Sequence, residues 1–200
     1  MPRVRVGDMR RRQLIDATID SIHDVGFSAT TLQSISRRAS LSTGLVAHYF
    51  KDKDGLLEAT LRSLASDLSA VIAEKLGLAV TPRERLQAII GGLLAPEQFE
   101  PRIARVWLAF WGQVTHAPKL KRVQNIYEKR LLSNLRHAFR DVLTREDAEQ
   151  QAIALAALID GLWLRAALSQ EPSNAEQAQA LCLEYIDSIL ERQRENCPAA

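Results

Sequence analysis

Apolar residues in this chain recur every three or four positions and nowhere alternate convincingly with a period of two. The clearest case is a seam with 4-3-4-3 spacing, which puts all its side chains on one face of a helix. The seam consists of Leu57, Leu61, Leu64, Leu68 and Val71. Glycine is scarce, with 9 in 200 residues, so it seldom interrupts a helix. These features predict an all-α fold.

Prolines, glycines and capping residues divide the chain into nine expected helices. Gly26 follows the first helix, and Pro82, Pro101 and Pro118 each stand where a first helical turn tolerates proline. The expected ranges are about 10–25, 32–39, 43–49, helices starting near 54, 82, 101 and 118, then 145–169 and 175–193.

The stretch 30–57 contains the two expected short helices, separated by a four-residue break at 40–43. Thr30 or Thr31 is placed to cap the first helix, and Ser42 to cap the second. The second helix has only about two turns and is too short to be stable alone, so it must pack on its neighbour. The residues expected to face inward are Leu32, Ile35, Ala39, Val46 and Phe50.

The outward N-terminal face of the second helix, with Thr43, Gly44 and Ala47, is small and polar enough to approach base edges in a DNA major groove. Residues 1–51 hold eight Lys/Arg against four Asp/Glu, whereas the remaining residues hold eighteen against twenty. A basic N-terminal part suggests a polyanionic partner. Its arginines either reach the minor groove and flanking phosphates or form a tail without fixed contacts; they are Arg3, Arg5, Arg10, Arg11 and Arg12.

The same segment resembles the signature of the TetR family of bacterial repressors. The matching positions are Thr31, Ile35, Ala39, Ser42, Gly44, Tyr49, Phe50, Lys53, Leu56 and Leu57. The resemblance implies that Ser42, Thr43 and Gly44 lie nearest the bases, and that phosphates are contacted by Thr31, His48, Tyr49 and Lys53. One position departs from the family: Ser40 stands where glycine is usual. We therefore expect a left-handed serine, at a cost on the order of 1 kcal/mol.

Further segments resemble the choline-responsive repressors of that family. They are RRRQLIDAT (10–18), HYFKDKDGLLEAT (48–60), WLAFW (107–111), KRLLSNL (129–135) and ALIDGLWLRAALS (157–169). The resemblance implies a three-helix DNA-binding domain over 1–53, with its helix-turn-helix at about 31–50, and a six-helix ligand-binding and dimerisation bundle over 54–200. It also implies a cytoplasmic, nucleoid-associated homodimer that pairs through its last two helices on a palindromic operator, released by choline or betaine aldehyde.

Aromatic residues are the candidates for holding such a cation. The expected helix from 101 carries one apolar stripe, which is either plain core or a cage whose aromatic faces hold a quaternary ammonium. Asp160 is either a counter-charge for the ligand or a buried ion-paired or hydrogen-bonded group at the dimer interface, where Arg165 of a second copy is the candidate partner. The candidate ligand-binding residues are Trp107, Phe110, Trp111, Tyr127, Asp160 and Trp163. A TetR-type repressor that answers another cationic or apolar molecule is the nearest alternative.

Other classes of function have little support in the sequence. The four histidines His23, His48, His116 and His137 do not cluster with Cys or acids at metal-ligand spacing, so no metal site is expected. No phosphate loop or nucleophile elbow is present, and we expect neither a cofactor nor an enzyme. The stretch Ile153 to Leu168 is broken by charged residues and too short to cross a bilayer, so no membrane partner is expected.

Overall fold

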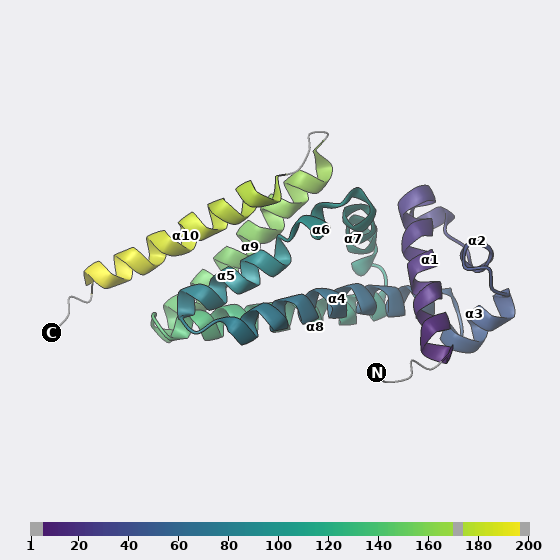
Figure 1. The fold of residues 1–200 in the computed structure, drawn as a ribbon, viewed down its shortest axis with the longest axis horizontal. Coiled ribbons are helices and arrows are strands. Elements are labelled where there is room, and N and C mark those ends of the chain that lie inside the picture. Colours follow the sequence, from purple (N-terminus) through teal and green to yellow (C-terminus); the bar gives the residue numbers. More distant parts are fainter. Residues whose placement is uncertain (1–5, 170–173, 197–200) are drawn as a thin grey trace. The chain divides into compact units, whose positions relative to one another are not determined.

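The computed structural model describes residues 6–169 and 174–196, and its regular elements in these ranges are all helices. The predicted all-α fold is confirmed (Figure 1). In chain order the helices are α1 (Val6–Ala29), α2 (Leu32–Arg38), α3 (Thr43–Phe50), α4 (Lys53–Leu78), α5 (Pro82–Leu93), α6 (Pro96–Phe99), α7 (Pro101–Val114), α8 (Pro118–Arg140), α9 (Arg145–Leu168) and α10 (Ala175–Asn196).

The helices group into two compact units, and the first contains the described residues up to Ser66 together with Pro101–Asn125. We call this unit the head. In it α1 packs against α7 and α2, and α2 packs against α3 (Figure 1). Its core contains large side chains that are fully buried, including Leu14, Ile35, Leu56, Leu61 and Phe110. The head thus combines the helix-turn-helix with α7, which the sequence places far downstream.

The second unit, which we call the body, contains Asp67–Glu100 and the described residues from Ile126 onward. Here α10 runs beside α5 and α9 (Figure 1). Arg83 of α5 donates two hydrogen bonds, of 2.6 and 2.8 Å, to the carboxylate of Asp187 on α10. The fully buried core residues Leu86, Ile89, Leu135 and Leu155 come from α5, α8 and α9, which hold the bundle together.

Some details of the expected helices are wrong. The first helix begins at Val6 rather than near residue 10, because Asp8 supplies a favourable charge in its first turn although no apolar periodicity marks the segment. A four-residue helix, α6, follows Pro96 and is too short to leave a periodic pattern. On α4 the buried seam continues through Ile72, whereas Val71 is 40% exposed.

The apolar residues of α10 are mostly buried, whereas some of those on α9 are exposed. The α10 stripe, expected at a dimer interface, is largely buried within the single chain, since Ala178, Cys182, Ile186 and Ile189 are at most 6% exposed. A face of α9 remains open, with Ile153 52% and Leu168 68% exposed. By length and composition α9 could span a bilayer, contrary to expectation, but core helices of soluble proteins have the same properties, so this is weak evidence.

Candidate functional site

The helix-turn-helix is held by two side-chain caps. The Thr31 hydroxyl accepts a hydrogen bond from the backbone N–H of Ser34, and the Ser34 hydroxyl accepts one from Thr31 in return. At the start of α3 the Ser42 hydroxyl accepts a hydrogen bond from the N–H of Leu45 at 3.2 Å. Thr31 and Ser42 are therefore confirmed as caps, and each satisfies a backbone donor that the first helical turn leaves open.

The turn between the two helices contains the strained residue that the sequence indicates. Ser40 has a φ of 52°, which lies in the left-handed region that glycine favours. Lys51, directly after α3, is the other non-glycine residue in the described ranges with a positive φ, at 67°. The expectation of a left-handed serine at this turn is confirmed. The chain therefore has a residue with positive φ shortly before α3 and another directly after it.

The outward face of α3 is open, as expected. Thr43, Gly44, Ala47 and His48 are exposed, while Val46 and Phe50 are at most 6% exposed and pack inward. A Cβ built on Gly44 would meet only the Ser42 hydroxyl oxygen within 4 Å, at 4.0 Å. Packing within the chain therefore does not require glycine at this position, although glycine weakens a helix.

The residues expected at phosphates lie around this face in different settings. The ring of exposed His48 meets the Tyr49 ring edge-on at 5.2 Å between centroids. Half-buried Tyr49 has its hydroxyl near Gly7 in the first turn of α1. Lys53 places its ammonium 5.9 Å from the centre of the Phe27 ring. All are in the head, with Thr31 also exposed, so each can be tested as a phosphate contact.

The basic arm is shorter than expected, because Arg10, Arg11 and Arg12 are part of α1. Arg11 donates to the carbonyl oxygen of Tyr49 at 3.5 Å and lies 4.6 Å above the Phe50 ring. Arg12 pairs with Asp16 at 3.3 Å. These two side chains tie α1 to its own surface and to α3. Arg3 and Arg5 lie outside the described residues.

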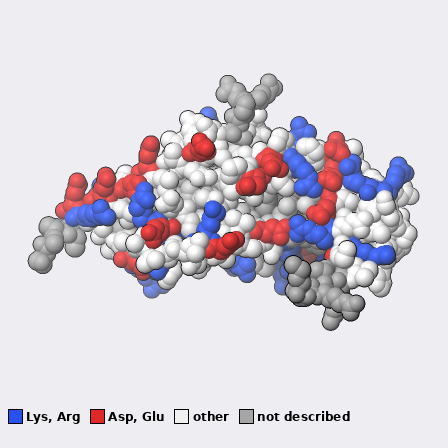
Figure 2. Space-filling model, viewed as in Figure 1, with Lys and Arg blue, Asp and Glu red and all other residues white. Residues whose placement is uncertain are grey.

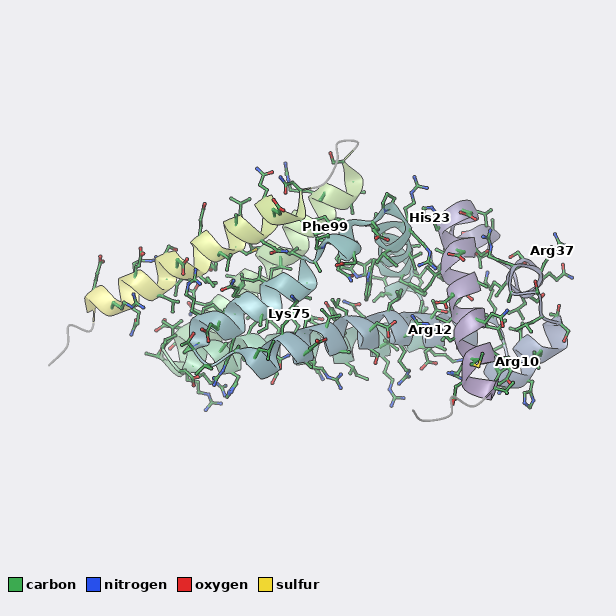
Figure 3. All side chains as sticks on the ribbon, in the orientation of Figure 1. Arg10, Arg12, His23, Arg37, Lys75 and Phe99 are labelled. Carbon is green, nitrogen blue, oxygen red and sulfur yellow. The ribbon has the colours of Figure 1, made fainter. Side chains whose placement is uncertain are left out.

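One exposed cation of the head escaped the sequence reasoning. Arg37 in the last turn of α2 points away from the neighbouring helices (Figure 3). Its neighbour Arg38 is instead paired with Asp24 of α1. Figure 2 shows acidic and basic side chains intermixed over α1, with basic side chains at the outer edge of the head. Sequence spacing could not distinguish Arg37 from Arg38, since the difference depends on where α1 lies.

The aromatic stripe of α7 is mostly buried in the head. Trp107 is 6% exposed and Phe110 fully buried, whereas Trp111 is half-buried. The Phe110 ring meets Phe27 of α1 edge-on, with centroids 5.8 Å apart. An ion pair of 2.7 Å between Arg102 and Asp20 also joins α7 to α1. Among the candidate ligand residues of α7, Phe110 is thus in direct contact with α1 of the head.

The other three candidate ligand residues belong to the body. Trp163 is 7% exposed and its indole N–H donates to the Gln98 carbonyl of α6 at 2.9 Å. Burial raises the pKa of Tyr127, and the negative charge of Asp160 raises it further. Asp160 keeps part of its surface exposed. Its pKa is nevertheless raised to about 6, mainly because its carboxyl is partly removed from water and to a smaller extent because of the negative charge of Glu128. Tyr127 and Asp160 are therefore electrostatic neighbours.

Tyr127 also lines a cavity of about 360 Å³ between α4, α5 and α8. The other lining residues are Ser69, Ile72, Ala73, Leu76, Leu93, Arg130, Leu131 and Asn134. A space of this size suits a small molecule, and its mixed apolar and polar lining is typical of ligand pockets. Among the residues that the structure describes, no group of three or more His, Cys, Asp or Glu side chains is arranged to hold a metal ion.

Comparison with known proteins gives consistent results over both parts of the chain. Residues 14–60 match the model of bacterial regulatory proteins of the tetR family, and residues 82–191 match the BetI-type transcriptional repressor C-terminal model. The HTH-type transcriptional regulator BetI of Klebsiella pneumoniae (strain 342) is 47% identical over 93% of this chain and 96% of its own length. BetI of Escherichia coli (strain K12 / DH10B) is 46% identical over 95% and 98%.

Solved structures share the fold. A transcriptional regulator from Pseudomonas aeruginosa PAO1 has a TM-score of 0.84 at 27% identity and covers 96% of each chain. A regulator from Saccharomonospora viridis, solved in complex with choline, has a TM-score of 0.75 at 22% identity and covers 90% of this chain and 96% of its own. At that identity the second likeness shows the fold alone.

Regulators of this family bind operator DNA and dimerise, and they act in the cytoplasm as transcription factors rather than enzymes. The family model over 14–60 and the relatives near 47% identity agree with the capped helix-turn-helix of the head. The chain belongs to the TetR family of bacterial transcriptional regulators and is a DNA-binding repressor of the BetI type.

Proposed function

We propose that this chain represses the genes for glycine betaine synthesis from choline, and that choline or betaine aldehyde relieves the repression. The main supporting observation is the α7 stripe, where two tryptophans flank a buried phenylalanine on a helix that packs against α1 within the DNA-binding head. A quaternary ammonium cannot donate a hydrogen bond and is best held by aromatic faces, each of which contributes roughly 0.5–2 kcal/mol.

The proposed ligand contacts include three residues of α7 and three of the body. They are Trp107, Phe110, Trp111, Tyr127, Asp160 and Trp163. The electrostatic coupling of Tyr127 to Asp160 supports a cation-holding role, because a bound positive charge would stabilise the Asp160 carboxylate. The BetI relatives near 47% identity, and the choline bound by the Saccharomonospora viridis regulator, support the same class of ligand.

The proposed DNA contacts follow the exposed surface of the helix-turn-helix. Ser42, Thr43 and Gly44 at the start of α3 approach the bases, and phosphates are contacted by Thr31, His48, Tyr49 and Lys53. Base contacts provide specificity, whereas phosphate contacts provide affinity and register. A two-fold dimer presents two such helices about one DNA turn, or a near multiple of it, apart, so we infer a palindromic operator and association with the nucleoid.

The proposed release mechanism couples α7 to α1 within the head. A ligand against α7 acts on α1 through the Phe27–Phe110 contact and the Arg102–Asp20 ion pair. The same Phe27 ring lies under the ammonium of Lys53, one of the proposed phosphate contacts. Ligand binding lowers DNA affinity only by its different affinity for the two states, and tenfold weaker DNA binding needs about 1.4 kcal/mol of coupling.

The test is a tryptophan fluorescence titration of the purified dimer with choline, with the uncharged isostere 3,3-dimethylbutanol as control. Saturable binding of choline without binding of the isostere supports an aromatic cage. Single Trp107→Phe, Trp111→Phe and Trp163→Phe variants then locate it, since the variant that lacks the reporting tryptophan loses the signal change. If neither compound binds, the choline proposal fails, while the repressor assignment stands on the family.

One observation favours a second candidate, a repressor of the same family that answers another small molecule. Arg130 lines the cavity beside Tyr127, and a guanidinium repels a bound cation. A ligand with an acceptor or anionic group would suit that wall better. The same titration with betaine aldehyde and with a carboxylate-bearing analogue, glycine betaine, separates the two candidates, because Arg130→Gln should weaken only a ligand that carries an anion.

A further inference from the structure

A buried serine joins the two helices of the helix-turn-helix. Ser36 of α2 is 5% exposed, and its hydroxyl oxygen contacts two other oxygens. The first is the backbone carbonyl of Gln33 at 3.1 Å, and the second is the hydroxyl of Thr43 at 3.2 Å. Thr43 is the first residue of α3 and exposed, so it lies at the end of the recognition helix that faces outward.

Counting hydrogens fixes the direction of both contacts. The Gln33 carbonyl can only accept a hydrogen bond, and Ser36 has a single hydroxyl hydrogen to give. Both contacts are satisfied at once when Ser36 donates to Gln33 and Thr43 donates to Ser36. The reverse direction between Ser36 and Thr43 would leave two oxygens facing each other across 3.1 Å without a hydrogen between them. Such an arrangement is unfavourable in a buried position.

We propose that Ser36 is a positioning residue that turns the Thr43 hydroxyl into a pure hydrogen-bond acceptor, so that the base facing Thr43 must present an amine. This inference rests on the proposed contact between Thr43 and the bases. In the major groove the amines are N6 of adenine and N4 of cytosine. Guanine offers only the acceptors N7 and O6 on that edge, and thymine offers the acceptor O4 and a methyl group.

The backbone around Thr43 is held firmly enough for this polarity to matter. Ser42 caps α3 through the Leu45 N–H, which fixes the first turn in which Thr43 stands. Ser40 and the buried Ala39 define the preceding turn. With Ser36 holding its hydrogen, Thr43 directs its remaining lone pairs outward. The half-site therefore contains one position at which adenine or cytosine is preferred on the contacted strand.

The experiment begins with the full-length dimer and a randomised DNA duplex, from which repeated selection recovers the preferred operator. Each position of one half-site is then changed to the other three base pairs, and binding is measured by fluorescence anisotropy at fixed salt. One position should prefer adenine or cytosine by roughly fivefold over guanine and thymine, the effect of one neutral hydrogen bond. Replacing that base with an analogue that lacks the exocyclic amine should cost the same factor.

Two variants of the chain assign this preference to the Ser36–Thr43 pair. Thr43→Val keeps the shape and removes the hydroxyl, so the preference at that position should disappear. Ser36→Ala frees the Thr43 hydroxyl to donate as well as accept, so guanine and thymine should become tolerated at that position alone. In the double variant Ser36→Ala should have no further effect on base preference. A merely structural Ser36 would instead weaken binding to every duplex by a similar factor.

Ser21→Ala is the matched control. Ser21 is a buried serine of the same head, 2% exposed, whose hydroxyl contacts Thr30 and Ser34 of α2 and no residue of α3. This variant should leave every base preference unchanged. A Thr43-dependent preference for thymine or guanine, or a preference that Ser36→Ala does not alter, would overturn the inference while leaving the operator-binding function intact. Failure of selection to recover any sequence would instead contradict the proposed function.

Discussion

Two glycines of the head, Gly55 and Gly44, differ in how much space surrounds a side chain at their positions. A Cβ on Gly55 would lie 2.2 Å from the backbone carbonyl oxygen of Phe50, so the fold requires glycine there. A Cβ on Gly44 would meet only one atom, at 4.0 Å. We therefore expect Gly44→Ala to raise stability by about 1 kcal/mol through helix propensity and yet to weaken operator binding severalfold. Chemical denaturation and anisotropy titration measure the two effects.

Gly55→Ala is the control, because it should destabilise the head itself. Unchanged operator affinity in Gly44→Ala would show that DNA does not approach the α3 backbone closely at this point, and the base contacts would then have to come from longer side chains.

The left-handed Ser40 provides a second test at the scale of one residue. An L-residue in this conformation costs roughly 1–2 kcal/mol, part of which glycine recovers. Ser40→Gly should therefore raise the free energy of unfolding by about 1 kcal/mol, measured by urea denaturation. Ser28→Gly, at an exposed serine outside the left-handed region, should lower it. A loss of stability in Ser40→Gly would mean that the serine hydroxyl contributes more than the backbone strain costs.

Ser40 and Ser36 also show how far sequence reasoning reaches. The left-handed turn was predictable, because turn geometry depends on local spacing and on the residue type that usually fills it. The role of Ser36 was not, because its hydroxyl gains a partner only when α3 packs against α2. Capping residues, buried helix faces and the sign of φ at a turn are local properties, whereas the direction of a hydrogen bond between two helices depends on tertiary contact.

At the scale of elements, α1 and α7 form the contact that carries the proposed coupling. Phe27 is half-buried between the Phe110 ring and the Lys53 ammonium. Phe27→Ala should leave operator affinity without ligand nearly unchanged, and reduce the loss of affinity that saturating choline causes by at least about threefold. Operator binding with and without choline measures the difference.

Phe99→Ala is the matched control for Phe27→Ala, since Phe99 is also a half-buried ring but belongs to α6 of the body. An equal choline effect in the native chain and in Phe27→Ala would exclude the α1–α7 contact as the coupling path, and would direct attention to α4, which runs through both units.

The tie between α5 and α10 predicts a pH dependence. The hydrogen bonds from Arg83 lower the pKa of Asp187 below its usual value. A carboxyl of this kind stabilises the fold above its unfolded pKa of about 4, and the contribution is lost as pH falls through the lower folded pKa. Asp187→Asn should lower Tm by about 2 °C at pH 7, with a difference that shrinks toward pH 3, as measured by thermal unfolding.

Arg83→Gln should give the same shift as Asp187→Asn, and the double variant should give no larger one. Additive losses would mean that the two side chains stabilise the body through separate contacts rather than through their mutual pair.

Element boundaries were predicted where periodicity or capping marks them and missed where neither does. The 4-3-4 spacing of α4 places its buried face correctly as far as Leu68, but only the packed bundle selects Ile72 over Val71. The α10 stripe was correctly identified as apolar, and most of it is covered within the single chain, while Leu181 stays 42% exposed. An apolar stripe indicates that a face is covered and does not indicate by which element.

For the whole molecule, the open face of α9 is the surface proposed for dimerisation. Ile153, Ala154, Ala157 and Leu168 are exposed in the single chain and fall on one side of the helix. Asp160 lies on the same side, which agrees with the interpretation that it pairs across the interface with Arg165 of a second copy. Burial of this face also explains why so apolar a helix remains stable in water.

Ala157→Arg tests this surface, because a guanidinium repeated across a two-fold interface brings two positive charges together in a space that fits a methyl group. The variant should sediment as a monomer and keep the native circular dichroism, since Ala157 is exposed in the single chain. Its affinity for a palindromic operator should fall on the order of 100-fold, because the two heads no longer bind as one molecule.

Ala70→Arg, at an exposed alanine of α4, is the control and should remain dimeric and keep its affinity. A dimeric Ala157→Arg with native affinity would place the interface on another face, and Asp160 would then be free to act on the ligand instead.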